Sequence, residues 1–117
     1  MTVRLPLPAA KKLTIIYNVE SGCLGPQGRS HIEPFCQFAQ EQMADLHSDF
    51  INWQITPRTD NNKPEIQYSL MNKLLQDHQA EKFLSYFNKS VDELETFLLG
   101  IIVILIEQYH NEHPETN

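Results

Sequence analysis

Residues 13–38 read LTIIYNVESGCLGPQGRSHIEPFCQF and contain the strand, loop and helix start around which the chain is arranged. Apolar residues occupy every odd position from 13 to 19. This alternation predicts a strand with one buried face. The segment that follows, residues 20–30, contains three glycines and one proline, a composition typical of a loop.

The pattern after the loop predicts a helix. Apolar residues recur at helical spacing from 32 to 46, with polar residues largely opposite. Ser30 and Glu33 match a capping box. Pro34 would stand fourth in that register, where its missing amide hydrogen is one the helix needs. We therefore expect the helix to begin one to three residues after Ser30.

Two further strands are expected in the middle of the chain. Residues 50–56 alternate between apolar and polar, and the polar, turn-rich segment 57–64 ends that strand. Residues 65–73 alternate again, which predicts a third strand paired antiparallel with the second. A helix over 65–75 is the alternative, because its leucines also suit helical spacing.

The last third of the chain is expected to be helical. Asp77 is a plausible N-cap for a short helix. Ser90 and Glu93 form a second capping box that opens the final helix.

The resulting order, β-α-β-β-α-α, predicts an α+β fold. We expect a two-layer sandwich in which a small, three-stranded mixed sheet carries the helices on one face, since a strand-helix-strand crossover is almost always right-handed. The other face would be polar. Residues 1–12 are expected to form an extended N-terminal arm, 13–110 a single α+β domain and 111–117 a polar tail.

Composition restricts the class of protein. The chain has 117 residues, 41% of them hydrophobic, and a net charge of −6, which is globular and argues against nucleic acid or an anionic membrane as a partner. Two cysteines are too few for a disulfide-built fold. The N-terminus lacks the apolar region of a signal peptide. The longest apolar run, 97–106, is half the length of a spanning helix. We therefore expect a cytoplasmic protein that meets no membrane.

That apolar run has no polar side, unlike the first helix. A helix that is apolar all round must be buried all round, and a chain of this size cannot easily cover every side of it. We expect a homodimer, with an interface that includes Leu98, Ile102, Val103 and Ile106. The alternative is that this helix is the central core helix of one protomer.

The glycine-rich loop is the candidate ligand site. A loop that precedes a helix N-terminus gathers free N–H groups, which could bind an anion. The candidate ligand-binding residues are Glu20, Gly22, Cys23, Gly25, Gly28, Arg29, Ser30 and His31. The spacing of the glycines matches neither the dinucleotide fingerprint nor the P-loop. The alternative is a flexible crossover loop that needs glycine for its backbone angles.

Few side chains suggest chemistry. The helix field and Arg29 could lower the pKa of Cys23, with His31 near enough in sequence to act as its base. Cys36 lies on the apolar stripe and suits a buried position. His110 and His113 have the spacing of a helical metal pair near the polar tail. No complete set of nucleophile, base and orienting group is present, and no cofactor or metal is expected.

These patterns favour a non-catalytic interaction or regulatory protein that acts as a homodimer and contacts another protein. An anion-binding or thiol-active protein that uses Cys23 and Arg29 is the alternative.

Overall fold

The computed structural model describes residues 4–60 and 62–114. The elements follow in the order η1 (Ala9–Lys11), β1 (Leu13–Val19), η2 (Ser21–Leu24), α1 (Gly28–Met43), β2 (Ile51–Pro57), β3 (Ile66–Leu70), β4 (Lys73–Leu75), α2 (Asp77–Ser85) and α3 (Val91–Glu112). The α+β class is confirmed.

The sheet is mixed and has four strands in the order β2-β1-β3-β4. β1 runs parallel to β2 and antiparallel to β3, and β3 runs antiparallel to β4. The expected three-stranded sheet is therefore wrong in strand number. The expected pairing of β2 with β3 is also wrong, because β1 lies between them.

Asn18 explains why β3 lies beside β1. Its side chain is 2% exposed and donates hydrogen bonds to the Pro64 carbonyl, at 2.8 Å, and to the Gln67 side-chain oxygen, at 3.0 Å. A buried amide must be hydrogen-bonded, and these partners are supplied only if the chain after the loop returns along β1. The hydrogen bonds of Asn18 thus stabilise β3 in its place beside β1.

A tight turn divides the expected third strand into β3 and β4. Met71 and Asn72 both have positive φ, 52° and 67°, as in the two-residue hairpin turns that match strand twist. Leu70 pairs with Lys73 across the turn. The single strand expected over 65–73 is therefore wrong after Leu70, and so is the helical alternative.

The first helix begins at Gly28, earlier than expected. Gln27 is the N-cap and none of the described side chains caps the helix, so the capping box at Ser30 is wrong. A Cβ on Gly28 would lie 1.9 Å from the Ser21 carbonyl oxygen, which only glycine allows. Pro34 lies inside the helix. Its missing amide hydrogen would have bonded Ser30, whose exposed position gives the carbonyl access to water.

The later caps differ in how well they were predicted. Ser90 caps α3, because its hydroxyl accepts a hydrogen bond from the Glu93 amide at 3.1 Å. For α2 the cap is Gln76, which forms a capping box with Gln79. The N-cap expected at Asp77 is therefore wrong by one residue.

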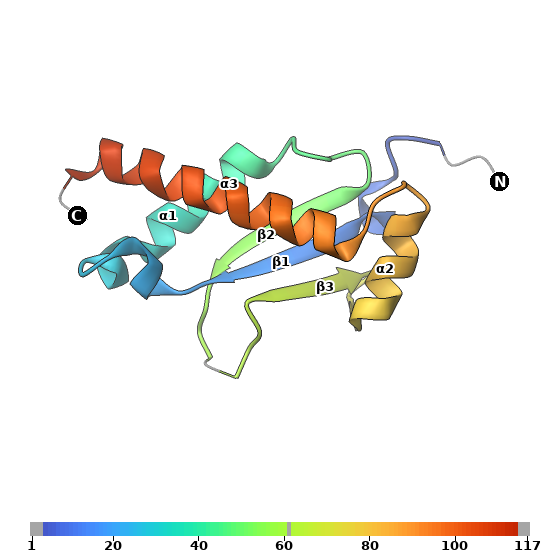
Figure 1. Ribbon diagram of the computed structural model, residues 1–117, viewed down its shortest axis with the longest axis horizontal. Coiled ribbons are helices and arrows are strands. Elements are labelled where there is room, and N and C mark those ends of the chain that lie inside the picture. The colour runs from blue at the N-terminus through green and yellow to red at the C-terminus, as the bar shows by residue number, and fades with distance from the viewer. Residues whose placement is uncertain (1–3, 61, 115–117) are drawn as a thin grey trace.

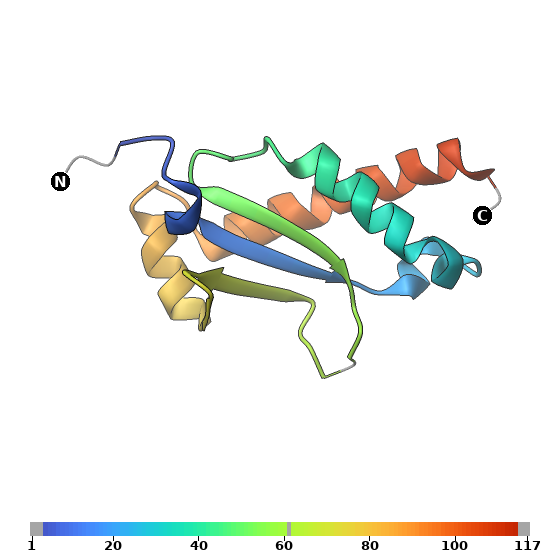
Figure 2. The same ribbon diagram turned by 180° about the vertical axis from the view of Figure 1, so that it is seen from behind.

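Helix α3 crosses one face of the sheet, in front of the strands in Figure 1 and behind them in Figure 2. On the opposite face, none of the described residues forms a helix that crosses the strands (Figure 2). The core lies between the layers. Its fully enclosed members include Leu13, Ile15, Phe35, Met43, Leu84 and Leu98.

The N-terminal segment lies against the beginning of β2. The Leu7 amide donates to the Asp49 carbonyl at 2.9 Å, and the Asn52 side chain donates to the Ala9 carbonyl at 3.1 Å. Residues 1–3 of the expected arm and 115–117 of the expected tail lie outside the described residues. At the other end, α3 continues two residues beyond the expected domain boundary, to Glu112.

Candidate functional site

Three apolar side chains in the middle of α3 face outward. Leu99, Val103 and Ile104 are 41%, 58% and 50% exposed. Gly100 lies among them, and a Cβ on Gly100 would meet no described atom within 4 Å. We call these four residues the α3 ridge. They form a shallow apolar strip along one side of the helix, with room for close approach at the glycine.

The ridge differs from the interface expected from sequence. Leu98 and Ile102 are 0% and 3% exposed and belong to the core of their own protomer. Ile106 is half-buried against that core. Of the four expected residues, Val103 alone is largely exposed. Because the run 97–106 has no polar side, its sequence could not indicate which apolar residues face the sheet.

Aromatic and polar contacts hold α3 in this orientation. Phe97 packs edge-on against the His47 ring, with centroids 4.8 Å apart, and lies 6.1 Å from Trp53. The Tyr68 hydroxyl donates a 2.5 Å hydrogen bond to the Glu95 carboxylate. Leu98 and Ile102 also face the core, so Val103 and Ile104 lie on the outward side of the helix, while Leu99 follows Glu95 by one turn along the same flank.

Polar residues flank the ridge at both ends. Asp92 and Thr96 are exposed before it, and Glu107 and Asn111 are exposed after it. The apolar strip is therefore short and bounded by hydrophilic positions, as in the core and rim of a protein interface.

The candidate ligand loop folds tightly at the carboxyl end of β1. Residues 21–24 form η2, and Gly25 has a φ of 91°, a conformation that favours glycine. A cleft of about 280 Å³ lies beside the loop, lined by Tyr17, Asn18, Glu20, Cys23, Arg58 and Glu65. Glu20 and Cys23 are thus brought together, while Gly22, Gly25, Arg29, Ser30 and His31 do not line the cleft.

The charges around Cys23 oppose the expected thiolate. Burial, followed by the nearby carboxylates of Glu65 and Glu20, raises the pKa of Cys23. The expectation of a lowered pKa is therefore wrong. The guanidinium in the cleft belongs to Arg58, which forms an ion pair with Glu20 at 3.0 Å. Arg29 is exposed on the outside of α1.

His31 lies against the end of α3 and not beside Cys23. Its Nδ1 is 2.8 Å from the Tyr109 hydroxyl, and its ring is 6.0 Å from that of His113. His110 donates from Nε2 to the Leu24 carbonyl at 3.0 Å. The expected pair of His110 and His113 thus serves two different contacts. Among the described residues, no group of three or more histidine, cysteine or carboxylate side chains could hold a metal ion.

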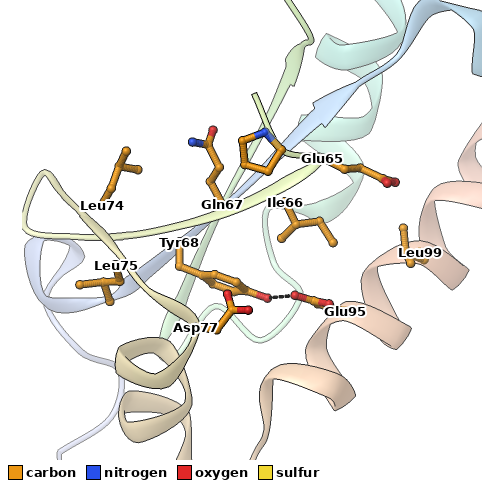
Figure 3. Close-up of a pocket in the computed structure, with 10 residues that line it drawn as sticks. Glu65, Ile66, Gln67, Tyr68, Leu74, Leu75, Asp77, Glu95 and Leu99 are labelled. Atoms are coloured by element: carbon orange, nitrogen blue, oxygen red, sulfur yellow. Dashed lines mark hydrogen bonds between the residues drawn. The ribbon is translucent and has the colours of Figure 1, made fainter. Parts of the chain in front are cut away.

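A second hollow, of about 500 Å³, lies between β3, β4, the start of α2 and α3. Figure 3 shows Ile66 and Tyr68 projecting from β3 toward Asp77 and Glu95. Leu99 of the α3 ridge also lines it. Sequence patterns did not indicate this hollow, because its lining comes from four elements that the strand order brings together.

Comparison of the chain with protein-family models, with curated proteins and with solved structures finds no match. The described helices include none with the length and apolar character needed to cross a membrane.

Proposed function

We propose that this chain is a small, non-catalytic, cytoplasmic interaction protein that acts as a homodimer through the α3 ridge. The observation that carries the proposal is the exposure of Leu99, Val103 and Ile104 on successive turns of one helix. Contiguous apolar side chains on a surface are characteristic of contact sites, and closed two-fold dimers are the commonest assembly.

The ridge suits a second copy of itself in the antiparallel direction. With the two-fold axis between Ile101 and Ile102, Leu99 would lie opposite the partner's Ile104, and Gly100 opposite the partner's Val103. Each glycine would thus receive a branched side chain. A helix pair related in this way is isologous, as a two-fold dimer requires.

The carboxylates on the exposed side of α3 also favour the antiparallel direction. In the antiparallel pair, Asp92 would lie opposite the partner's Asn111, and Thr96 opposite the partner's Glu107. No carboxylate among these exposed positions would then face another. A parallel pair would place each of these carboxylates opposite its own copy, which is destabilising.

The mass of the purified chain, measured by light scattering during gel filtration at micromolar concentration, tests the proposal. The wild type is expected to elute with the mass of two chains. Val103→Glu would bury two charges in the interface, so we expect this variant to elute with the mass of one chain.

Tyr86→Glu is the matched control, because Tyr86 is 67% exposed at the C-terminal end of α2 and lies outside the ridge. This variant should keep the mass of two chains. A wild type with the mass of one chain, or equal effects of the two substitutions, would contradict the proposal.

A further inference from the structure

The two edges of the sheet are protected differently. At the β2 edge, the Gln40 side chain donates to the Trp53 carbonyl at 2.7 Å and accepts from the Ile55 amide at 2.9 Å. Gln40 therefore occupies the hydrogen-bonding positions that another strand could use, as expected for a protected edge.

The β3 edge is open beyond the end of β4. The last pair between the two strands is Tyr68 with Leu75, so none of the strands in the described part of the chain lies on the outer side of Ile66. The Asn18 amide donates to the Glu65 carbonyl, which places residues 65, 67 and 69 in bonding positions toward β1. By the alternation of an antiparallel ladder, the N–H and C=O of Ile66 point outward.

The open edge borders the 500 Å³ hollow of Figure 3. Its apolar walls come from Ile66, Leu75 and Leu99, while Glu65, Asp77 and Glu95 supply carboxylates. The described residues that line it include no lysine or arginine. An unpaired strand edge thus adjoins an apolar space with a surplus of negative charge.

We propose that this groove binds an extended segment of a partner protein that carries a lysine or arginine. The segment would exchange a pair of backbone hydrogen bonds with Ile66, as in strand addition to a sheet edge. Its basic side chain would enter the hollow, with the aliphatic stem against Ile66 and Leu99 and the cationic head toward Asp77 and Glu95.

Charge selects this occupant over other peptides. Three carboxylates line the hollow and the whole chain carries a net charge of −6. An acidic segment would be repelled, and a purely apolar one would leave these carboxylates without a cation. Among the described pairings, Tyr68 and Leu70 of β3 are taken by β4, which leaves the outward backbone groups of Ile66 for a partner. The side chain in the hollow would therefore supply much of the selectivity.

The inference is independent of the homodimer, although Leu99 belongs to both surfaces. Val103 does not line the hollow, so Val103→Glu separates the two proposals. If the ridge mediates dimerisation and the groove binds peptide, the Val103→Glu variant no longer dimerises but still binds the peptide.

The probe is a fluorescein-labelled, seven-residue peptide of alternating valine and lysine, titrated with the full chain and followed by fluorescence anisotropy. We expect saturable binding, and slower hydrogen exchange of the Ile66 amide by NMR when the peptide is bound. The double variant Asp77→Asn and Glu95→Gln should weaken binding about tenfold or more. The side-chain amide oxygen introduced by Glu95→Gln could still accept the Tyr68 hydrogen bond.

Matched controls separate groove binding from general attraction. Glu41→Gln with Asp45→Asn removes the same charge from exposed positions near the end of α1 and should leave affinity nearly unchanged. A peptide with glutamate in place of lysine, or with alternate backbone nitrogens methylated, should not bind. Absence of binding, equal weakening by the two double variants, or an unchanged Ile66 amide would each overturn the proposal.

Discussion

Tyr68 on β3 donates its hydroxyl to the Glu95 carboxylate on α3, with 2.5 Å between the oxygens. Tyr68 is 2% exposed, and burial followed by this hydrogen bond raises its pKa well above the usual range. The bond links the sheet to the helix one turn before Leu99. It therefore helps to fix which side of α3 faces outward and carries the ridge.

Removing this hydroxyl should destabilise the fold. Tyr68→Phe leaves a partly buried carboxylate without its donor, so we expect the free energy of unfolding to fall by about 1.5–3 kcal/mol. Urea denaturation at neutral pH measures the change. Tyr86→Phe, at an exposed position, should change stability by less than about 0.5 kcal/mol. A Tyr68→Phe variant as stable as the wild type would show that the bond does not anchor α3.

Gln40 should protect the β2 edge. Gln40→Ala removes the partner of two backbone groups, the Trp53 carbonyl and the Ile55 amide. We expect a loss of about 1–3 kcal/mol in the free energy of unfolding, with increased aggregation on heating because the edge is uncovered. Thermal denaturation monitored with light scattering measures both effects.

Gln42→Ala is the control on the same helix, because Gln42 is exposed and the strand's two hydrogen bonds to this helix are made by Gln40. Equal behaviour of the two variants would mean that water replaces Gln40 at no cost.

Much of the fold was open to prediction from local sequence. The alternation in β1 and β2 and the Ser90 cap follow from side-chain periodicity and capping, which act within a few residues. The position of β3 beside β1 is stabilised by Asn18, whose partners are more than 45 residues away. No local pattern reports such a contact.

The errors have specific causes. The turn at Met71 and Asn72 is not predictable from its sequence because it lacks the Asn-Gly signal of such turns. The start of α1 lies earlier than the sequence predicts because the helix contains Pro34 in its interior, where proline is normally excluded. The ridge was only partly predicted, since burial on a helix without a polar side depends on how the helix lies on the sheet.

The two thiols should react differently. Cys23 is exposed and Cys36 is 4% exposed. In the native protein we expect a disulfide reagent to modify Cys23 alone, slowly because its pKa is raised, and Cys23→Ser to abolish that reaction. The Cys36 thiol should react only when the chain unfolds. Rapid modification of Cys36 in the folded chain would contradict its burial.

Alkaline pH should weaken the fold through Cys36. Burial, followed by the charge of Glu33, raises the pKa of Cys36 to about 11 from 9.0. The unfolded chain therefore loses this proton first, so stability is present below pH 9 and falls between about 9 and 11. Between these pH values, the free energy of unfolding of Cys36→Ala should fall by about 2–3 kcal/mol less than that of the wild type. Parallel pH curves for the two proteins would contradict the prediction.

Mild acid should weaken the fold through His47. Burial, followed by the charge of Lys89, lowers the pKa of His47 below its usual 6.5. The unfolded chain binds this proton first, so stability falls as pH drops below about 6.5. His47→Asn suits the φ of 49° and should flatten the acid limb of the stability curve between pH 7 and 5. If the acid limb of His47→Asn were the same as that of the wild type, groups other than His47 would cause the loss of stability in acid.

Sedimentation equilibrium of the wild-type chain over a range of micromolar concentrations tests the homodimer most directly. We predict a reversible equilibrium between one and two chains that Val103→Glu shifts entirely to one chain. A wild type that sediments as one chain at every concentration would contradict the account and leave Leu99, Val103 and Ile104 as an exposed strip with no second copy to cover it.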